Sequence, residues 1–189
     1  VAKIVEKPFS EAGVIFESEN LSIEARRLDH TVESWGYRFR EPDGATMLPE
    51  KLKALGVFGK DVGRLKADGK IVVNGKTFLL EEASVFKKGL SAAFLMDTRV
   101  CDAAFELAKE VNFLICESTY LSSETDEALK NGHLTAAQAA EIARDSNAIK
   151  LVLTHFSPRY ASVEDFEREA KMIHAETIAV RDGEQVAIN

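Results

Sequence analysis

The sequence predicts an α/β fold whose first part is an antiparallel sheet and whose second part alternates strands with helices. In the first forty residues, apolar and polar side chains alternate, which is typical of half-buried antiparallel strands. After Gly89, short apolar runs alternate with helical segments, which is typical of parallel strands joined by helices. The chain has 189 residues, 46% of them apolar, and this is enough for one domain with a sizeable core.

The first part of the chain divides into strands, a helix and a hairpin. Alternation predicts strands over residues 14–17, 21–28 and 36–40. Pro42-Asp43-Gly44 ends this pattern, and Pro49 begins a short helix that Gly56 closes after Leu55. Residues 56–69 are rich in glycine and lysine and weakly patterned, so we expect a mobile arm there. Asn74-Gly75 predicts a hairpin between residues 70–73 and 76–80.

The second part has the rhythm of strand, helix, strand. Apolar runs predict strands over residues 92–96, 112–116 and 150–154, with a first helix over residues 101–110. Thr135-Ala136-Ala137-Gln138 is a capping box that begins a second helix ending near Asp145. Ser162 is a candidate N-cap for a third helix over residues 163–174. Asp182-Gly183 predicts a closing hairpin between residues 176–180 and 185–188.

Charge and cysteine content narrow the class of protein. The net charge of −7 argues against a protein that binds nucleic acid over its whole surface. A local basic strip is still compatible with this net charge. The densest basic stretch contains Lys51, Lys53, Lys60, Arg64, Lys66 and Lys70. A solvated helix face explains this stretch as well as a phosphate-binding strip does. Two cysteines without metal-binding spacing, no signal-peptide pattern and no long apolar run predict a cytoplasmic protein without a membrane span.

Titratable side chains follow three of the predicted strands. Asp97 comes directly after residues 92–96, Glu117 after residues 113–116, and His155 after residues 150–154. The carboxyl ends of such strands meet at one edge of a sheet, and imidazole with carboxylate suits zinc-like ions. Each residue alone also has an ordinary structural interpretation: Asp97 as a turn cap and His155 as a partly buried, hydrogen-bonded side chain. Three strand ends together favour a catalytic or metal site.

Further candidates lie in the adjoining loops. His133 comes two residues before the capping box, and this position beside a helix N-terminus suits a general acid. The alternative is a surface-loop histidine, which we disfavour because Glu117 is available to orient it. Arg99 and Arg159 flank the candidate site and could each clamp a phosphate, or form a structural ion pair.

In order and spacing together, these motifs resemble ribonuclease Z, the tRNA 3′-processing endonuclease of the metallo-β-lactamase superfamily. The resemblance runs from about Leu28 to Tyr160. The matching motifs are Asp29-His30, Ser34-Trp35-Gly36-Tyr37-Arg38, Asp97-Thr98-Arg99, Glu117-Ser118-Thr119, Gly132-His133-Leu134-Thr135-Ala136-Ala137-Gln138 and Leu153-Thr154-His155-Phe156-Ser157-Pro158-Arg159-Tyr160.

The resemblance implies an αββα sandwich with two zinc ions at one edge of its paired sheets. His30 would bind one ion, His155 the other, and Asp97 would bridge them. Glu117 and His133 would form the pair that orients a proton and delivers it to the leaving oxygen. The implied activity is removal of the 3′ trailer from precursor tRNA by phosphodiester hydrolysis, with two ions stabilising the attacking and leaving oxygens.

The chain also departs from the pattern of this family. The upstream His-x-His-x-Asp-His motif is absent, so residues 1–189 would be a C-terminal portion that lacks an N-terminal segment and is inactive alone. Residues 42–69 would correspond to the projecting tRNA-binding arm, without the usual Gly-Pro element. Half a sandwich would leave an apolar sheet face, so we expect the missing segment or a homodimer to cover it.

Two rival functions remain open at this point. One is a different hydrolase of the same fold that acts on small phosphodiesters or esters. The other is a non-catalytic binding half that keeps the fold without metal.

Overall fold

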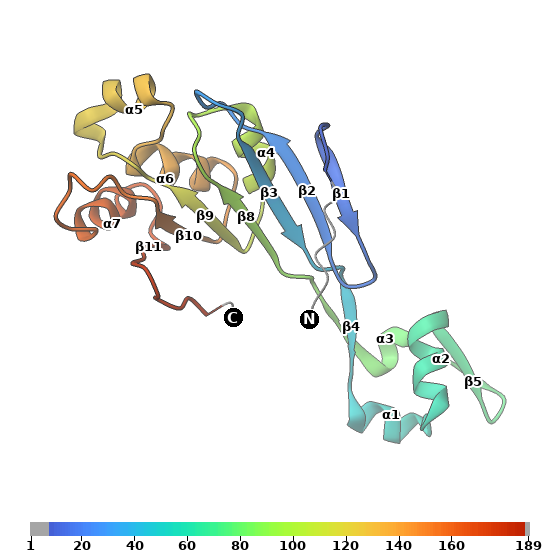
Figure 1. Cartoon of the computed structure of the whole chain (residues 1–189). Coiled ribbons are helices and arrows are strands. Elements are labelled where there is room, and N and C mark those ends of the chain that lie inside the picture. The colour runs from blue at the N-terminus through green and yellow to red at the C-terminus, as the bar shows by residue number, and fades with distance from the viewer. Residues whose placement is uncertain (1–7, 188–189) are drawn as a thin grey trace. The chain divides into compact units, whose positions relative to one another are not determined.

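The computed structural model describes residues 8–187, and it divides the chain into two compact units (Figure 1). Unit 1 contains the residues up to Glu41 and those from Leu90 onward. Unit 2 is the intervening segment, Pro42–Gly89.

Unit 1 is built on one seven-stranded sheet with the order β1-β2-β3-β8-β9-β10-β11. The strands are β1 Gly13–Glu17, β2 Ser22–Arg27, β3 Trp35–Arg40, β8 Ser91–Leu95, β9 Phe113–Glu117, β10 Lys150–Thr154 and β11 Thr177–Ala179. Pairing is antiparallel from β1 to β8 and parallel from β8 to β11. The predicted α/β fold with an antiparallel first part is therefore confirmed.

Helices cover one face of this sheet. They are α4 Asp102–Ala108, α6 Ala136–Asp145 and α7 Glu164–Lys171, and α6 begins with the predicted capping box. Leu95, Leu114 and Leu153 point from the sheet into the same fully buried cluster as Ile142 of α6 and Phe166 of α7. Burying such a side chain contributes about 1.5–3 kcal/mol each, so this layer pair holds unit 1 together.

The opposite face of the sheet carries apolar side chains that are partly exposed. Tyr37, Phe94 and Ile115 are exposed in part and lie in one row with the buried Val152 across four strands, because each is paired with the next in register. Phe94 is 40% exposed, and Phe16 of β1 is 45% exposed. One sheet with helices on one face is half of the αββα arrangement that the resemblance implied.

Unit 2 combines two short strand pairs with helices. β4 Gly44–Met47 pairs with β7 Ser84–Lys87, and β5 Lys70–Val73 pairs with β6 Lys76–Leu79. Helices α1 Pro49–Leu55 and α2 Lys60–Asp68 connect β4 to β5, and α3 Leu80–Ala83 connects β6 to β7. The predicted helix is confirmed, and it ends at Gly56 with a φ of 70°. Because β7 returns to β4, the unit extends beyond the predicted arm of residues 42–69 as far as Gly89.

Two expectations for local structure were wrong. Residues 56–69 contain helix α2, because Leu65 and Val57 are buried against Leu52 and Ala83 in a small core that the sparse apolar pattern did not reveal. The closing hairpin is not formed in the described residues, since Thr177–Ala179 pairs in parallel with β10 and residues 184–187 form no strand. Ile188, the last residue of that predicted hairpin, lies outside the described residues. Among residues 8–187, no helix is long and apolar enough to cross a membrane.

Candidate active site

Three neighbouring parallel strands deliver acidic and imidazole side chains to one edge of the sheet. Leu95, Cys116 and Leu153 are level with one another in β8, β9 and β10. Asp97, Glu117 and His155 follow them within two residues, and so lie at the same carboxyl edge. The structure therefore brings together the three strand-end residues that the sequence singled out.

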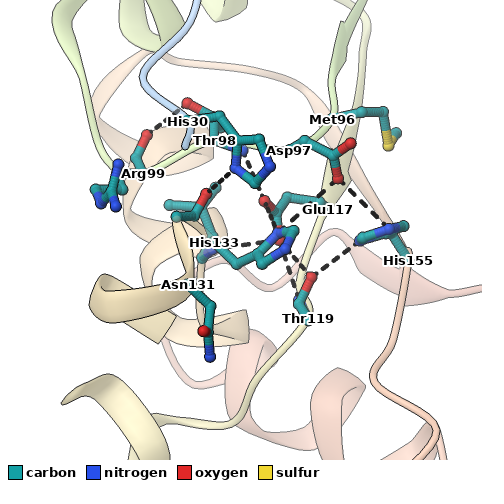
Figure 2. Close-up of polar contacts among 12 residues, drawn as sticks. His30, Met96, Asp97, Thr98, Arg99, Glu117, Thr119, Asn131, His133 and His155 are labelled. Carbon is teal, nitrogen blue, oxygen red and sulfur yellow. Dashed lines mark hydrogen bonds and ion pairs between the residues drawn. The ribbon is translucent and has the colours of Figure 1, made fainter. Parts of the chain in front are cut away.

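The backbone turns sharply at two of these positions. Asp97 has a φ of 53° and His155 a φ of 58°, both in the left-handed region. A residue with a Cβ atom is disfavoured there by about 1–3 kcal/mol, and such residues cluster at functional sites. Both turns direct side chains toward each other, with Asp97 Oδ1 3.5 Å from His155 Nε2 (Figure 2).

Glu117 is a fully buried carboxylate surrounded by hydrogen-bond donors. Its Oε1 accepts from the Thr98 N–H at 2.8 Å and contacts His133 Nδ1 at 2.9 Å. Its Oε2 accepts from the Thr119 hydroxyl at 2.7 Å and from the N–H groups of Thr119 and Leu134 at 3.3 and 3.2 Å. An unpaired buried carboxylate would be very costly, and these donors offset that cost. Glu117 is thereby held rigidly against His133.

His133 occupies the centre of the cluster. It lies between α5 Thr125–Asn131, which ends at Gly132 with a φ of 86°, and the capping box of α6. Its side chain is only 16% exposed. Its ring centroid is 4.9 Å from that of His30 and 5.4 Å from that of His155. Helix ends on both sides thus fix this loop histidine, as the capping box predicted.

His30 is held by the same loop. Its Nδ1 lies 2.8 Å from the Gly132 carbonyl oxygen, and because a carbonyl only accepts, Nδ1 must donate. A Cβ atom on Gly132 would come within 2.6 Å of this nitrogen. Glycine is therefore required at position 132 both for its backbone conformation and for the approach of His30.

Asp97, His133 and His155 have the donor set and spacing of a metal site. One ligand atom from each lies within 4.8 Å of the others, and Figure 2 shows the three side chains turned toward one another. One carboxylate and two imidazoles fit zinc or a similar transition-metal ion. In this described part of the chain His30 is not a member of the group, although it contacts His133. The resemblance to ribonuclease Z had implied His30, rather than His133, as a ligand together with Asp97 and His155.

The two candidate phosphate-binding arginines are engaged with the protein itself. Arg99 donates from Nε to the Leu129 carbonyl at 2.8 Å, and its Nη1 is 3.1 Å from Asp29. Arg159 pairs with Glu124 at 2.7 Å, and its guanidinium lies 5.0 Å from the Tyr120 ring centroid.

These contacts of Arg159 also shift the pKa of both partners. The hydrogen bond that Arg159 donates to Glu124 raises the pKa of Arg159. Hydrogen bonds from Tyr160 and then Arg159 lower the pKa of the Glu124 carboxyl. The structural ion pair considered for each arginine is therefore present.

Sequence reasoning gave no role to the groups that hold Glu117 and His30. Thr98, Thr119 and Gly132 are close neighbours of residues that were selected, and all three stand within the motifs that carry the resemblance. Nothing local marks them, because a hydroxyl, an N–H or a carbonyl becomes a hydrogen-bond partner only when folding brings the matching group near.

Comparison with solved structures identifies the fold. The chain superposes on a metallo-β-lactamase fold protein from Bacillus subtilis with a TM-score of 0.57 and 14% identity, covering 88% of this chain and 49% of that one. It superposes on the short form of human tRNase Z with a TM-score of 0.58 and 24% identity, covering 93% of this chain and 46% of that one. The fold is the metallo-β-lactamase fold.

Sequence similarity identifies relatives of this chain. No family model matches the chain. A curated ribonuclease Z from Streptomyces coelicolor is 45% identical over 168 residues, which cover 89% of this chain and 54% of that protein. The chain is therefore homologous to ribonuclease Z over most of its own length and spans about half the length of the curated relatives it matches. The resemblance predicted from the sequence is confirmed.

Proposed function

We propose that this chain supplies part of the active site of a zinc-dependent endoribonuclease that removes the 3′ trailer from precursor tRNA. One observation carries the proposal: Asp97, His133 and His155 converge beside the buried Glu117, in a chain homologous to ribonuclease Z.

His30, Asp97 and His155 are the proposed zinc ligands, with two ions in a complete site. When bound, the ions supply electrophilic stabilisation of the attacking and leaving phosphodiester oxygens. The position of His133 within the ligand group makes it the rival third ligand. Metal analysis of His30→Ala and His133→Ala separates the two assignments, since only the true ligand lowers zinc content strongly.

Glu117 and His133 form the proposed proton-transfer pair. Because both oxygens of Glu117 accept hydrogen bonds, His133 donates its Nδ1 proton to this carboxylate and keeps a lone pair on Nε2. Glu117 thus orients the ring, and protonated His133 can deliver a proton to the leaving 3′ oxygen.

Unit 2 and the two arginines are the proposed tRNA contacts. Unit 2 carries nine lysines and arginines against six acidic residues, a net charge of +3 within a chain of −7. Its six most closely spaced basic side chains, from Lys51 to Lys70, are all exposed. Such side chains bind phosphates through charge and counterion release. Arg99 and Arg159 are proposed to reach phosphates near the cleavage point with their remaining N–H groups.

Two further proposals concern what surrounds the chain. The partly exposed row of apolar side chains around Phe94 is proposed to be covered by a segment that carries the remaining metal ligands, with a homodimer as the assembly. Light scattering of the purified chain measures its molar mass and so tests for the homodimer. A cytoplasmic location is proposed because Cys101 and Cys116 are both free thiols.

Zinc content and substrate preference test the proposed function. We expect zinc to bind and to be lost in His155→Ala, measured both on the chain alone and together with the segment that carries the remaining ligands. A protein that binds no zinc in either form would instead be a non-catalytic binding half. The 189-residue chain alone should not cleave precursor tRNA, and robust cleavage would contradict the proposal that another segment completes the site. A complete enzyme that strongly preferred a small chromogenic diester over precursor tRNA would favour the rival hydrolase.

A further inference from the structure

The Thr119 hydroxyl joins two side chains of the candidate site. It lies 2.7 Å from Glu117 Oε2 and 2.9 Å from His155 Nδ1. Thr119 is only 7% exposed, and its backbone is fixed on both sides, by its N–H on Glu117 and by its carbonyl, which accepts from the Ser157 N–H. The hydroxyl therefore has a defined place between a buried carboxylate and an imidazole (Figure 2).

The hydrogen-bond donors fix the direction of this chain of contacts. A hydroxyl has one proton and two lone pairs. Glu117 Oε2 also receives N–H groups of Thr119 and Leu134, which can only donate, so this oxygen is an acceptor. The Thr119 proton thus goes to Glu117, and only a lone pair of its oxygen faces His155. His155 must then carry its proton on Nδ1, which leaves the lone pair on Nε2, the atom 3.5 Å from Asp97 Oδ1.

We propose that Thr119 is a positioning residue that fixes His155 in the Nδ1–H tautomer and so presents Nε2 toward Asp97. Metal-binding histidines commonly donate their second ring nitrogen to an oxygen that sets ring orientation and tautomer. The His155 side chain is 46% exposed, so packing alone holds its ring weakly, and the Thr119 contact supplies the orientation.

One buried carboxylate thereby orients two imidazoles. Glu117 Oε1 holds His133 directly, and Oε2 holds His155 through Thr119. The use of Nε2 toward a metal rests on the proposed function, whereas the tautomer of His155 follows from the hydrogen bonds alone. The two parts can be measured separately.

The first measurement is the tautomer of His155 in the metal-free 189-residue chain. Ring nitrogen shifts from ¹⁵N NMR at alkaline pH, where imidazole is neutral, distinguish the Nδ1–H and Nε2–H forms. We expect Nδ1–H in the wild-type chain and in Thr119→Ser, which keeps the hydroxyl. In Thr119→Val we expect the Nε2–H form, which is the more stable one for an unconstrained histidine. Thr177→Val is the matched control, because Thr177 contacts His174 at the other end of β10.

The second measurement is zinc affinity by competition with a chelator. We expect Thr119→Val to weaken zinc binding about 10- to 100-fold and Thr119→Ser to restore it. An Nε2–H tautomer in the wild-type chain, or an unchanged tautomer in Thr119→Val, overturns the proposal. The wild-type and serine results decide the matter even where the valine variant does not fold. If no variant binds zinc while the tautomer changes as expected, the proposed metal function fails and the positioning role stands.

Discussion

Unit 1 and unit 2 differ in the size of their buried cores. Among the described residues, unit 1 has a core of twenty buried residues and places a buried carboxylate and three histidines at one sheet edge. Unit 2 has a core of four buried residues and a net charge of +3, and most of its residues are exposed. The contrast separates two requirements: a site for chemistry needs side chains held in place, whereas a phosphate-binding surface needs charge in an accessible position.

The largest expected effect lies in unit 1, at Glu117. In Glu117→Leu, the N–H groups of Thr98, Thr119 and Leu134 lose their buried acceptor. Each such loss costs about 1–3 kcal/mol, so the free energy of unfolding should fall by about 5 kcal/mol. Urea unfolding followed by fluorescence of Trp35, the single tryptophan, measures this. Glu117→Gln, which keeps a carbonyl acceptor, is the control and should lose clearly less. Equal losses would show that the acceptor is unimportant.

The next effect tests whether the small core of unit 2 stands alone. Leu65→Ala removes a fully buried side chain of α2 and should cost unit 2 about 3 kcal/mol. Hydrogen exchange should accelerate in unit 2, while the unfolding transition seen at Trp35 in unit 1 stays where it was. The neighbouring exposed Lys66→Ala should leave both unchanged. A matching shift of the Trp35 transition would mean that the two units unfold as one.

A smaller effect should come from Gly132, which supports His30 in unit 1. Gly132→Ala places a Cβ atom in left-handed backbone and within 2.6 Å of His30 Nδ1, and we expect a loss of about 2 kcal/mol with a displaced His30 ring. Gly183→Ala is a matched control, because Gly183 has nearly the same φ, 83°, and nothing within 4 Å of its Cβ position. The difference between the two variants measures the contact with His30. Identical losses would leave only the backbone cost.

The smallest effect concerns charge in unit 2. Lys53→Ala and Lys60→Ala should each weaken binding of precursor tRNA by the chain and reduce the dependence of log affinity on log salt by about 1. Folding should be unaffected, since both side chains are exposed. Lys109→Ala, an exposed lysine of unit 1, is the control. If it weakened binding as much as the unit 2 variants, the proposed division of labour between the units would be wrong.

Local sequence pattern was enough to predict the strands and the capped start of α6, whereas the N-cap of α7 is Val163 rather than the predicted Ser162. Alternating side chains, the Asn74-Gly75 turn and the Thr135–Gln138 capping box depend on neighbours in the chain, and each predicted strand of the large sheet lies within one residue of its observed bounds. The meeting of Asp97, Glu117 and His155 could also be foreseen, because parallel strands end at a common edge.

The choice of groups that share hydrogen bonds at that edge depends on contacts between residues far apart in the sequence. The contact of His30 with Gly132 spans 102 residues of sequence, and that of Thr119 with His155 spans 36. The burial of Leu65 in unit 2 was equally hidden, because it depends on residues distant along the chain. Local sequence pattern predicts the period of a strand or helix, but it does not predict which distant donor will form a hydrogen bond with a carboxylate. The sequence therefore specified the framework and the reactive side chains, and folding specified their partners.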